Sequence, residues 1–164
     1  MTEAREWIQA LSLEPHPEGG WFRETYRSEQ NIGSCCLSRH RPGARSLSTA
    51  ILYLLEAGDC SAFHRIRSDE IWHHHGGSTF RIHVLDAGGH HVLRVGADLA
   101  SGALPQAVVP GGAWFAAEIE GDGWGLAGCT VAPGFEFEDF ELADRRALEN
   151  EFPEHAELVR RLAR

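Results

Sequence analysis

The chain has 164 residues, of which 43% are hydrophobic and 24% charged, a balance typical of a globular protein and not of a disordered one. Its 24 acidic residues outnumber its 15 basic ones, and the net charge of -9 argues against nucleic acid as a partner. Every basic residue is an arginine, which excludes Schiff-base, phosphate-loop and general-base chemistry that depends on lysine.

The residue pattern predicts a β-rich centre between two helical ends. Residues 2–11 carry Trp7, Ile8 and Leu11 at helical spacing, with Thr2 as a candidate N-cap. Short apolar or alternating runs separated by turn residues then predict strands at 21–26, 48–55, 61–66, 70–75, 79–86, 91–97, 106–110, 113–119 and 125–131. Residues 144–163 return to a helical pattern, with Asp144 as a cap and Pro153 at a break.

Regularly spaced strands without intervening helices predict a sandwich or a barrel. No apolar run approaches the ~20 residues that a membrane helix needs, and the first residues are charged and amphipathic instead of forming a signal-peptide pattern. We therefore expect a single domain over residues 1–164, located in the cytoplasm, with no membrane partner.

The segment from Gly58 to Gly77 resembles the first cupin motif. Gly58, His64, Glu70 and Gly77 fall at the spacing of that motif, whereas Ile66 stands where its second histidine is expected. The segment 108–119 resembles the second cupin motif through Pro110 and Gly112, but Phe115 stands in place of its histidine. The resemblance is therefore partial at the positions that bind metal in cupins.

A narrower resemblance extends over most of the chain. Segments 11–28, 45–55, 63–77, 105–114 and 128–142 are similar, in order, to the family known as cupin 5 or DUF985. This resemblance implies an all-β double-stranded β-helix, the cupin jelly-roll barrel, with short N- and C-terminal helices. It also implies a homodimer, and it specifies no particular chemistry.

The central hairpin carries the candidate catalytic pair. Side chains alternate along a strand, so His64 and Ile66 share a face, and Glu70 begins the next strand after a short turn. We expect His64 and Glu70 to point into one pocket, with His64 as the proton carrier and Glu70 as its orienting partner. Trp72 and His74 would share the inner face with Glu70, whereas His73 and His75 would face outward unless a bulge shifts the register.

A bound metal is the alternative use of the same residues. Catalytic zinc and iron sites usually have about three protein ligands, and only His64 and Glu70 remain at the expected positions. His74 lies roughly 13 Å along an extended strand from Glu70, too far to share one ion. We therefore predict no cofactor, with a divalent metal at His64 and Glu70 left open.

Several further residues are candidates for ligand binding. Arg23, on a strand after a Gly-Gly turn that also suits a dimer contact, could clamp an anionic group. Candidate cavity walls are Tyr53, Trp72, His74, Gln106 and Trp114, although core packing also explains the aromatic ones. The segment 133–142 is interpreted as an apolar strand face with an acidic edge.

Three functions remain open at this point. The first is a metal-independent isomerase or epimerase that acts on a carbohydrate-like or acidic small molecule, by analogy with other barrels of this kind. The second is a non-catalytic module that holds such a ligand unchanged. The third is a metal-dependent dioxygenase.

Overall fold

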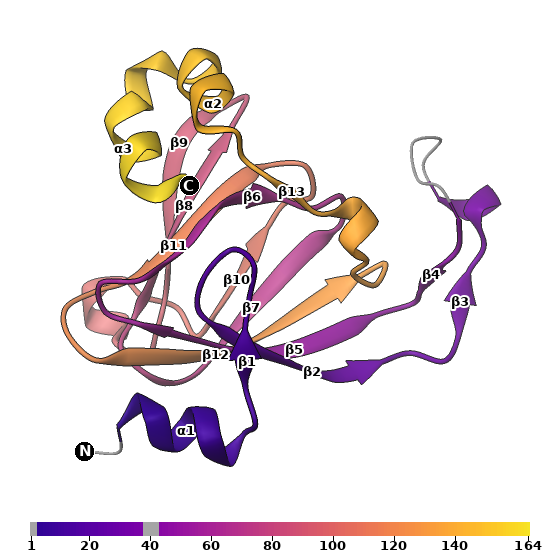
Figure 1. Ribbon diagram of the computed structural model, residues 1–164, viewed down its shortest axis with the longest axis horizontal. Coiled ribbons are helices and arrows are strands. Elements are labelled where there is room, and N and C mark those ends of the chain that lie inside the picture. The colour runs from indigo at the N-terminus through magenta and orange to yellow at the C-terminus, as the bar shows by residue number, and fades with distance from the viewer. Residues whose placement is uncertain (1–2, 38–42) are drawn as a thin grey trace.

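The structure is a computed structural model that describes residues 3–37 and 43–164, so the candidate cap Thr2 lies outside the described residues. Two antiparallel sheets face each other and form the barrel (Figure 1). The first has the order β1-β2-β5-β12-β7-β10, from Glu14–Pro15, Trp21–Arg27, Thr49–Glu56, Trp124–Ala132, Asp69–Gly77 and Gln106–Val109. The second has the order β13-β6-β11-β8-β9, from Glu141–Leu142, Cys60–Arg65, Trp114–Ile119, Phe80–Asp86 and Gly89–Val95.

Each predicted strand range overlaps an observed strand. The additional strands are β1 and a small ribbon of β3 (Asn31–Ile32) and β4 (Arg45–Ser46), and β13 is the end of the segment 133–142; each is only two residues long. Short 3-10 turns occur at η1 (Ser34–Cys36), η2 (Leu99–Ser101), η3 (Phe137–Asp139) and η4 (Pro153–His155). Neighbouring strands in both sheets are often distant in sequence, which is the connectivity of a jelly roll and confirms the predicted fold class.

Helices cover the outer faces of both sheets. Helix α1 (Ala4–Ala10) places Trp7 and Ile8 against Leu54 and Leu126 of the first sheet. Helices α2 (Arg145–Glu151) and α3 (Ala156–Leu162) lie over the second sheet (Figure 1). Asp144 caps α2 as predicted, because its Oδ1 accepts a hydrogen bond from the Ala147 amide at 2.8 Å. None of the described helices combines the length and hydrophobicity needed to cross a lipid bilayer.

Packed side chains fill one part of the barrel interior. Inward-facing residues of both sheets form this core, including Tyr53, Leu55, Trp72, Phe80 and Ile82, each no more than 1% exposed. Their alternation along the strands is the period-two pattern that identified those strands in the sequence. This core does not occupy the whole interior, and the remaining space is the candidate site.

Candidate functional site

A cavity of about 90 Å³ lies between the first sheet, β6 and the connection from β12 to β13. Its volume is smaller than the about 150 Å³ of a cavity in another protein that binds benzene, so it suits only a small ligand. Its lining comprises His16, Glu18, Phe22, Glu24, Arg27, Thr49, Ile51, His64, Ile66, Glu70, Cys129, Val131, Phe135, Glu136, Phe137 and Phe140. The two predicted catalytic residues thus meet in one apolar cavity, together with two residues that the sequence did not single out, His16 and Glu18.

His64 is held by both of its ring nitrogens. The side chain is 2% exposed, and its Nδ1 lies 2.8 Å from the carbonyl oxygen of Ala62. Because a carbonyl only accepts, Nδ1 carries a proton and donates it. The other nitrogen, Nε2, lies 3.0 Å from Oε2 of Glu18. A second proton must lie between these two atoms, so His64 and Glu18 form a proton-sharing pair in which Glu18 occupies the orienting place predicted for Glu70.

Glu18 reaches the cavity because of the loop that carries it. Gly19 and Gly20 follow it with φ angles of 115° and 71°, a region that favours glycine. A Cβ on Gly19 would lie 2.1 Å from the carbonyl oxygen of Cys60, so a side chain there would collide with backbone. The Tyr53 hydroxyl donates a hydrogen bond to the Gly19 carbonyl at 2.7 Å. This loop is therefore fixed against the barrel wall, and it directs Glu18 inward.

The Glu18 carboxyl group is buried and hydrogen-bonded. The residue is 5% exposed, and its Oε1 accepts a hydrogen bond from the Ser61 hydroxyl at 2.9 Å. Burial raises the pKa of Glu18, and the neighbouring His16 opposes this change. Burial likewise lowers the pKa of His64, although the nearby Glu70 acts in the opposite direction. Both effects favour uncharged partners that share a proton over a separated ion pair.

Glu70 is the carboxyl group best suited to exchange protons near neutral pH. Burial raises the pKa of Glu70 from 4.5 to about 7, with His64 lowering it and Glu18 raising it further. The thiol of Cys129 also donates a hydrogen bond to Glu70. Although His64 and Glu70 interact electrostatically as predicted, the carboxyl group within hydrogen-bond distance of Nε2 belongs to Glu18.

His16 lies on the other side of Glu18. Its Nδ1 is 3.5 Å from Oε2 of Glu18, and its ring packs edge-on against Phe22 with centroids 4.5 Å apart. Burial lowers the pKa of His16, and Glu18 partly counteracts this effect. The polar end of the cavity therefore has two imidazoles and two carboxyl groups, and both imidazoles pack against phenyl rings.

The connection from β12 to β13 forms the aromatic wall of the cavity. Phe135, Phe137 and Phe140 of this segment line it together with Phe22. The interpretation of residues 133–142 as a strand face was wrong for most of the segment, because Phe137–Asp139 form the turn η3 and only the residues of β13 pair with β6. The turn directs the phenyl groups over the cavity, where a strand would alternate them between two faces.

Arg27 lies at the cavity with its charge already balanced. Its Nε donates to Glu24 at 3.0 Å, its Nη1 donates to Glu136 at 2.6 Å, and its Nη2 donates to the carbonyl of Phe135 at 3.0 Å. These contacts use the guanidinium donors that an anionic ligand would need. The cavity therefore suits an uncharged ligand better than an acidic one.

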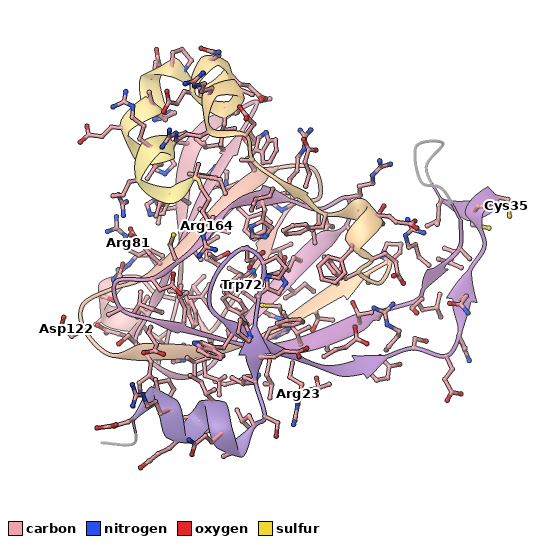
Figure 2. The ribbon with its side chains drawn as sticks, in the orientation of Figure 1. Arg23, Cys35, Trp72, Arg81, Asp122 and Arg164 are labelled. Carbon is pink, nitrogen blue, oxygen red and sulfur yellow. The ribbon has the colours of Figure 1, made fainter. Side chains whose placement is uncertain are left out.

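The candidate ligand residue Arg23 lies away from this cavity. It is in β2 between Phe22 and Glu24, which both line the cavity, so the alternation of the strand turns Arg23 to the opposite face (Figure 2). The predicted anion clamp is not formed at this cavity.

The aromatic candidates are part of packed clusters. Tyr53 and Trp72 stand edge-to-face in the main core with ring centroids 5.6 Å apart, and both are 1% exposed. Trp114 packs in the cluster beneath the C-terminal helices, and the Arg65 guanidinium lies 4.2 Å from its ring centroid. None of the three belongs to the cavity lining: Tyr53 and Trp72 lie in the filled part of the barrel, and Trp114 lies in the cluster that the C-terminal helices cover.

The histidine run of β7 is divided by a bulge. His73 pairs with Gly128 and His74 with Ala127, but the next pair joins Gly76 to Leu126, so His75 has no partner in the register. His73 faces outward, where its Nε2 lies 3.3 Å from the Thr130 hydroxyl and its Nδ1 lies 3.2 Å from Nε2 of Gln106. The candidates His74 and Gln106 are thus also outside the cavity lining.

The cavity residues do not fit the metal site of the cupin motifs. Ile66 and Phe115 have no ligating atoms, and both nitrogens of His64 are engaged by Ala62 and Glu18. Among residues 3–37 and 43–164, no group of three or more histidine, cysteine, aspartate or glutamate side chains is arranged to hold a metal ion. We therefore derive no chemical step that depends on a metal.

Comparisons with known proteins agree with this architecture. A protein from Shewanella oneidensis is 39% identical, with a TM-score of 0.89 over 100% of this chain and 99% of its own. A hypothetical protein from Leishmania major is 31% identical, with a TM-score of 0.90 over 99% of each chain. A Klebsiella pneumoniae protein with a double-stranded β-helix domain is 15% identical, has a TM-score of 0.53 over 88% of this chain and 96% of its own, and shows the fold alone. Residues 5–143 match the family model described as "Cupin superfamily (DUF985)", and the chain therefore belongs to this family, cupin 5.

Proposed function

We propose that the cavity binds a small, uncharged, carbohydrate-like molecule and moves a proton on it, as an isomerase or epimerase does without a metal. The observation that carries this proposal is the buried cluster of Glu18, His64 and Glu70 at the polar end of an otherwise apolar cavity. Burial of an isolated charge destabilises the folded state, so such a cluster would lower the stability of the protein without benefit if it served only packing. Clusters of perturbed ionisable groups in a cavity are typical of functional sites.

Glu70 is the proposed proton carrier. Its pKa of about 7 is close to the value at which a general base is both deprotonated and able to hold a proton. A carbon acid bound against Glu70 would give its proton to the carboxylate, and the same carboxyl group would return it to a neighbouring carbon on the same face, which is isomerisation. Epimerisation would need a second proton donor on the opposite face of the ligand. His64 and Glu18 would then act as positioning residues, because their shared proton fixes the electrostatic surroundings of Glu70.

The ligand class follows from the charge and shape of the cavity. The phenyl groups of Phe22, Phe135 and Phe140 offer flat apolar surfaces, against which the carbon face of a sugar or another ring packs well. Because Arg27 is already bound by Glu24 and Glu136, an added carboxylate or phosphate would have no free cation at this site. An uncharged ligand avoids that cost.

Solvent-deuterium exchange tests the proposal. Purified protein would be incubated in heavy water with a panel of small aldoses and ketoses, and incorporation next to the carbonyl group would be followed by NMR. We expect exchange with at least one sugar in the wild type, a loss of at least tenfold in Glu70→Gln, and no change in the exposed control Glu14→Gln. Binding would be measured in parallel by ligand-detected NMR.

Two outcomes would replace the proposal with the alternatives. If wild type and Glu70→Gln bind a sugar equally but exchange equally slowly, the protein is a passive binding module. If elemental analysis of protein purified without a histidine tag finds near-stoichiometric iron, manganese or nickel, metal-dependent oxygenase chemistry takes precedence.

A further inference from the structure

A second chemically distinctive group lies on the ribbon that leaves the barrel. The ribbon of β3 and β4 extends away from the two sheets, and the turn η1 at its outer part carries Cys35 and Cys36 (Figures 1 and 2). At its base Arg45, 3% exposed, pairs with the buried carboxylate of Asp139 at 2.8 Å, which fixes the ribbon to the turn η3. Both thiols are exposed, so neither contributes to a core.

The spacing of the two sulfurs suits a bridging atom better than a disulfide. Adjacent Cα atoms are about 3.8 Å apart, below the ~4.4 Å at which ordinary disulfides begin, so a direct S–S bond between them is strained. The two Sγ atoms are 3.6 Å apart. Two metal–sulfur bonds of about 2.3 Å that meet at a near-tetrahedral angle hold their sulfurs roughly 3.7 Å apart. A thiophilic atom can therefore bridge the pair with little movement of the chain.

We propose that Cys35 and Cys36 form a binding site for thiophilic metals and metalloids that accept two sulfur ligands, such as trivalent arsenicals. Zinc is a poorer match, because structural zinc usually takes four protein ligands and this turn supplies two sulfurs. Soft sulfur ligands favour soft acceptors, and the exposure of both thiols lets an acceptor approach from solvent.

The other two cysteines are poorly placed to compete for such an acceptor. Cys129 is 2% exposed, and burial raises the pKa of its thiol. Burial also raises the pKa of the Cys60 thiol, with Asp59 adding to the effect. Since the thiolate is the form that attacks, both react less readily than an unburied thiol.

The bonding step needs no oxidant. An arsenoxide, R–As=O, forms two As–S bonds with the two thiols while its arsenic–oxygen bond breaks. The two thiol protons leave with that oxygen as water, and arsenic remains trivalent. Because the second bond forms within one molecule, the chelate resists displacement by a monothiol but not by a competing dithiol.

Intact-mass spectrometry of the full-length reduced chain with phenylarsine oxide tests the site. We expect one adduct per chain that survives a hundredfold excess of glutathione and is removed by 2,3-dimercaptopropanol. Cys35→Ser and Cys36→Ser should each lower the fraction that survives glutathione at least tenfold, whereas Cys60→Ser should leave it unchanged. Circular dichroism would establish that each variant is folded.

The opposite results would contradict the proposal. An adduct that survives glutathione in Cys35→Ser or Cys36→Ser would overturn the proposal, as would its loss in Cys60→Ser. Displacement from the wild type by glutathione alone would show that the two sulfurs do not act as a chelate. None of these outcomes depends on the function of the cavity.

Discussion

Replacement of Glu70 by glutamine should make the free energy of unfolding depend less on pH. The size of this effect follows from the buried position of the carboxyl group. Burial raises the pKa of Glu70 from 4.5 to about 7, so between these values the folded chain binds a proton that the unfolded chain releases. A group of this kind stabilises the fold at low pH. Its contribution is lost as the pH rises through the pKa of the folded state.

The magnitude follows from the two pKa values. Taking 4.5 in the unfolded chain and about 7 in the folded chain, the contribution of Glu70 to the free energy of unfolding falls by about 2.5 kcal/mol from pH 5 to pH 8. Glutamine does not titrate, so the variant lacks this loss. Glu70→Gln should therefore gain about 2.5 kcal/mol relative to the wild type over the same range, whatever its stability at pH 5.

Urea denaturation of both proteins at pH 5 and pH 8 measures this difference directly. Comparison within each pH removes most of the effect of the other titrating groups, among them His64 and Glu18, whose pKa values burial shifts in opposite directions. The difference in free energy of unfolding between the exposed control Glu14→Gln and the wild type should be the same at both pH values. If the difference between Glu70→Gln and the wild type is also the same at both pH values, Glu70 is solvated in the folded protein. The reason for assigning the proton transfer to Glu70 would then be lost.

Three further substitutions, at Gly19, Tyr53 and Arg45, test the supports of the cavity by urea denaturation, with Gly58→Ala and Arg160→Ala as controls. Gly19→Ala should lower the free energy of unfolding by at least about 2 kcal/mol, because its Cβ would meet the Cys60 carbonyl oxygen at 2.1 Å. Gly58→Ala, at φ 87° but in open space, should cost only about 1 kcal/mol, and equal losses would contradict the steric argument. Tyr53→Phe removes the hydrogen bond to the Gly19 carbonyl and should cost about 1 kcal/mol. Arg45→Ala removes the buried partner of Asp139 while Arg67 remains 3.5 Å from its Oδ1, and should cost about 2 kcal/mol; a loss no larger than that of the exposed control Arg160→Ala would refute this.

The barrel strands could be predicted because the alternation of apolar and polar side chains along a strand is visible in consecutive residues of the sequence. In β5, Tyr53 and Leu55 enter the core while Leu54 packs under α1, so the run is apolar on both faces and still has the length of a strand. The strands that were missed, such as β1 and β3, contain two residues and have no measurable period. Their pairing is determined by the parts of the chain that they contact.

The candidate site was predicted where it depends on one hairpin and missed where it depends on a loop. His64 and Glu70 flank a short turn, and strand alternation alone directs both inward. Glu18 reaches His64 only because the positive φ angles at Gly19 and Gly20 fold a distant segment against β6. The Gly-Gly pair was the available signal, and it was interpreted only as a turn that leads into the strand at 21–26. Tyr53 and Trp72 were recognised as interior residues, but composition does not tell a cavity wall from a packed core.

The same geometry supports the proposal that this cavity, with its partly retained cupin motif, transfers a proton. In a metal-binding site of this kind, the cation compensates for the charge of a buried carboxylate. Ile66 and Phe115 cannot provide ligands here, and Glu18 adds a second carboxyl group next to His64. Two unpaired buried carboxylates would be very costly, so protons must reduce that charge, and the raised pKa values of Glu18 and Glu70 express this requirement. Because those protons are held in a cavity open to a ligand, the arrangement that makes the buried cluster tolerable also makes a proton available for transfer.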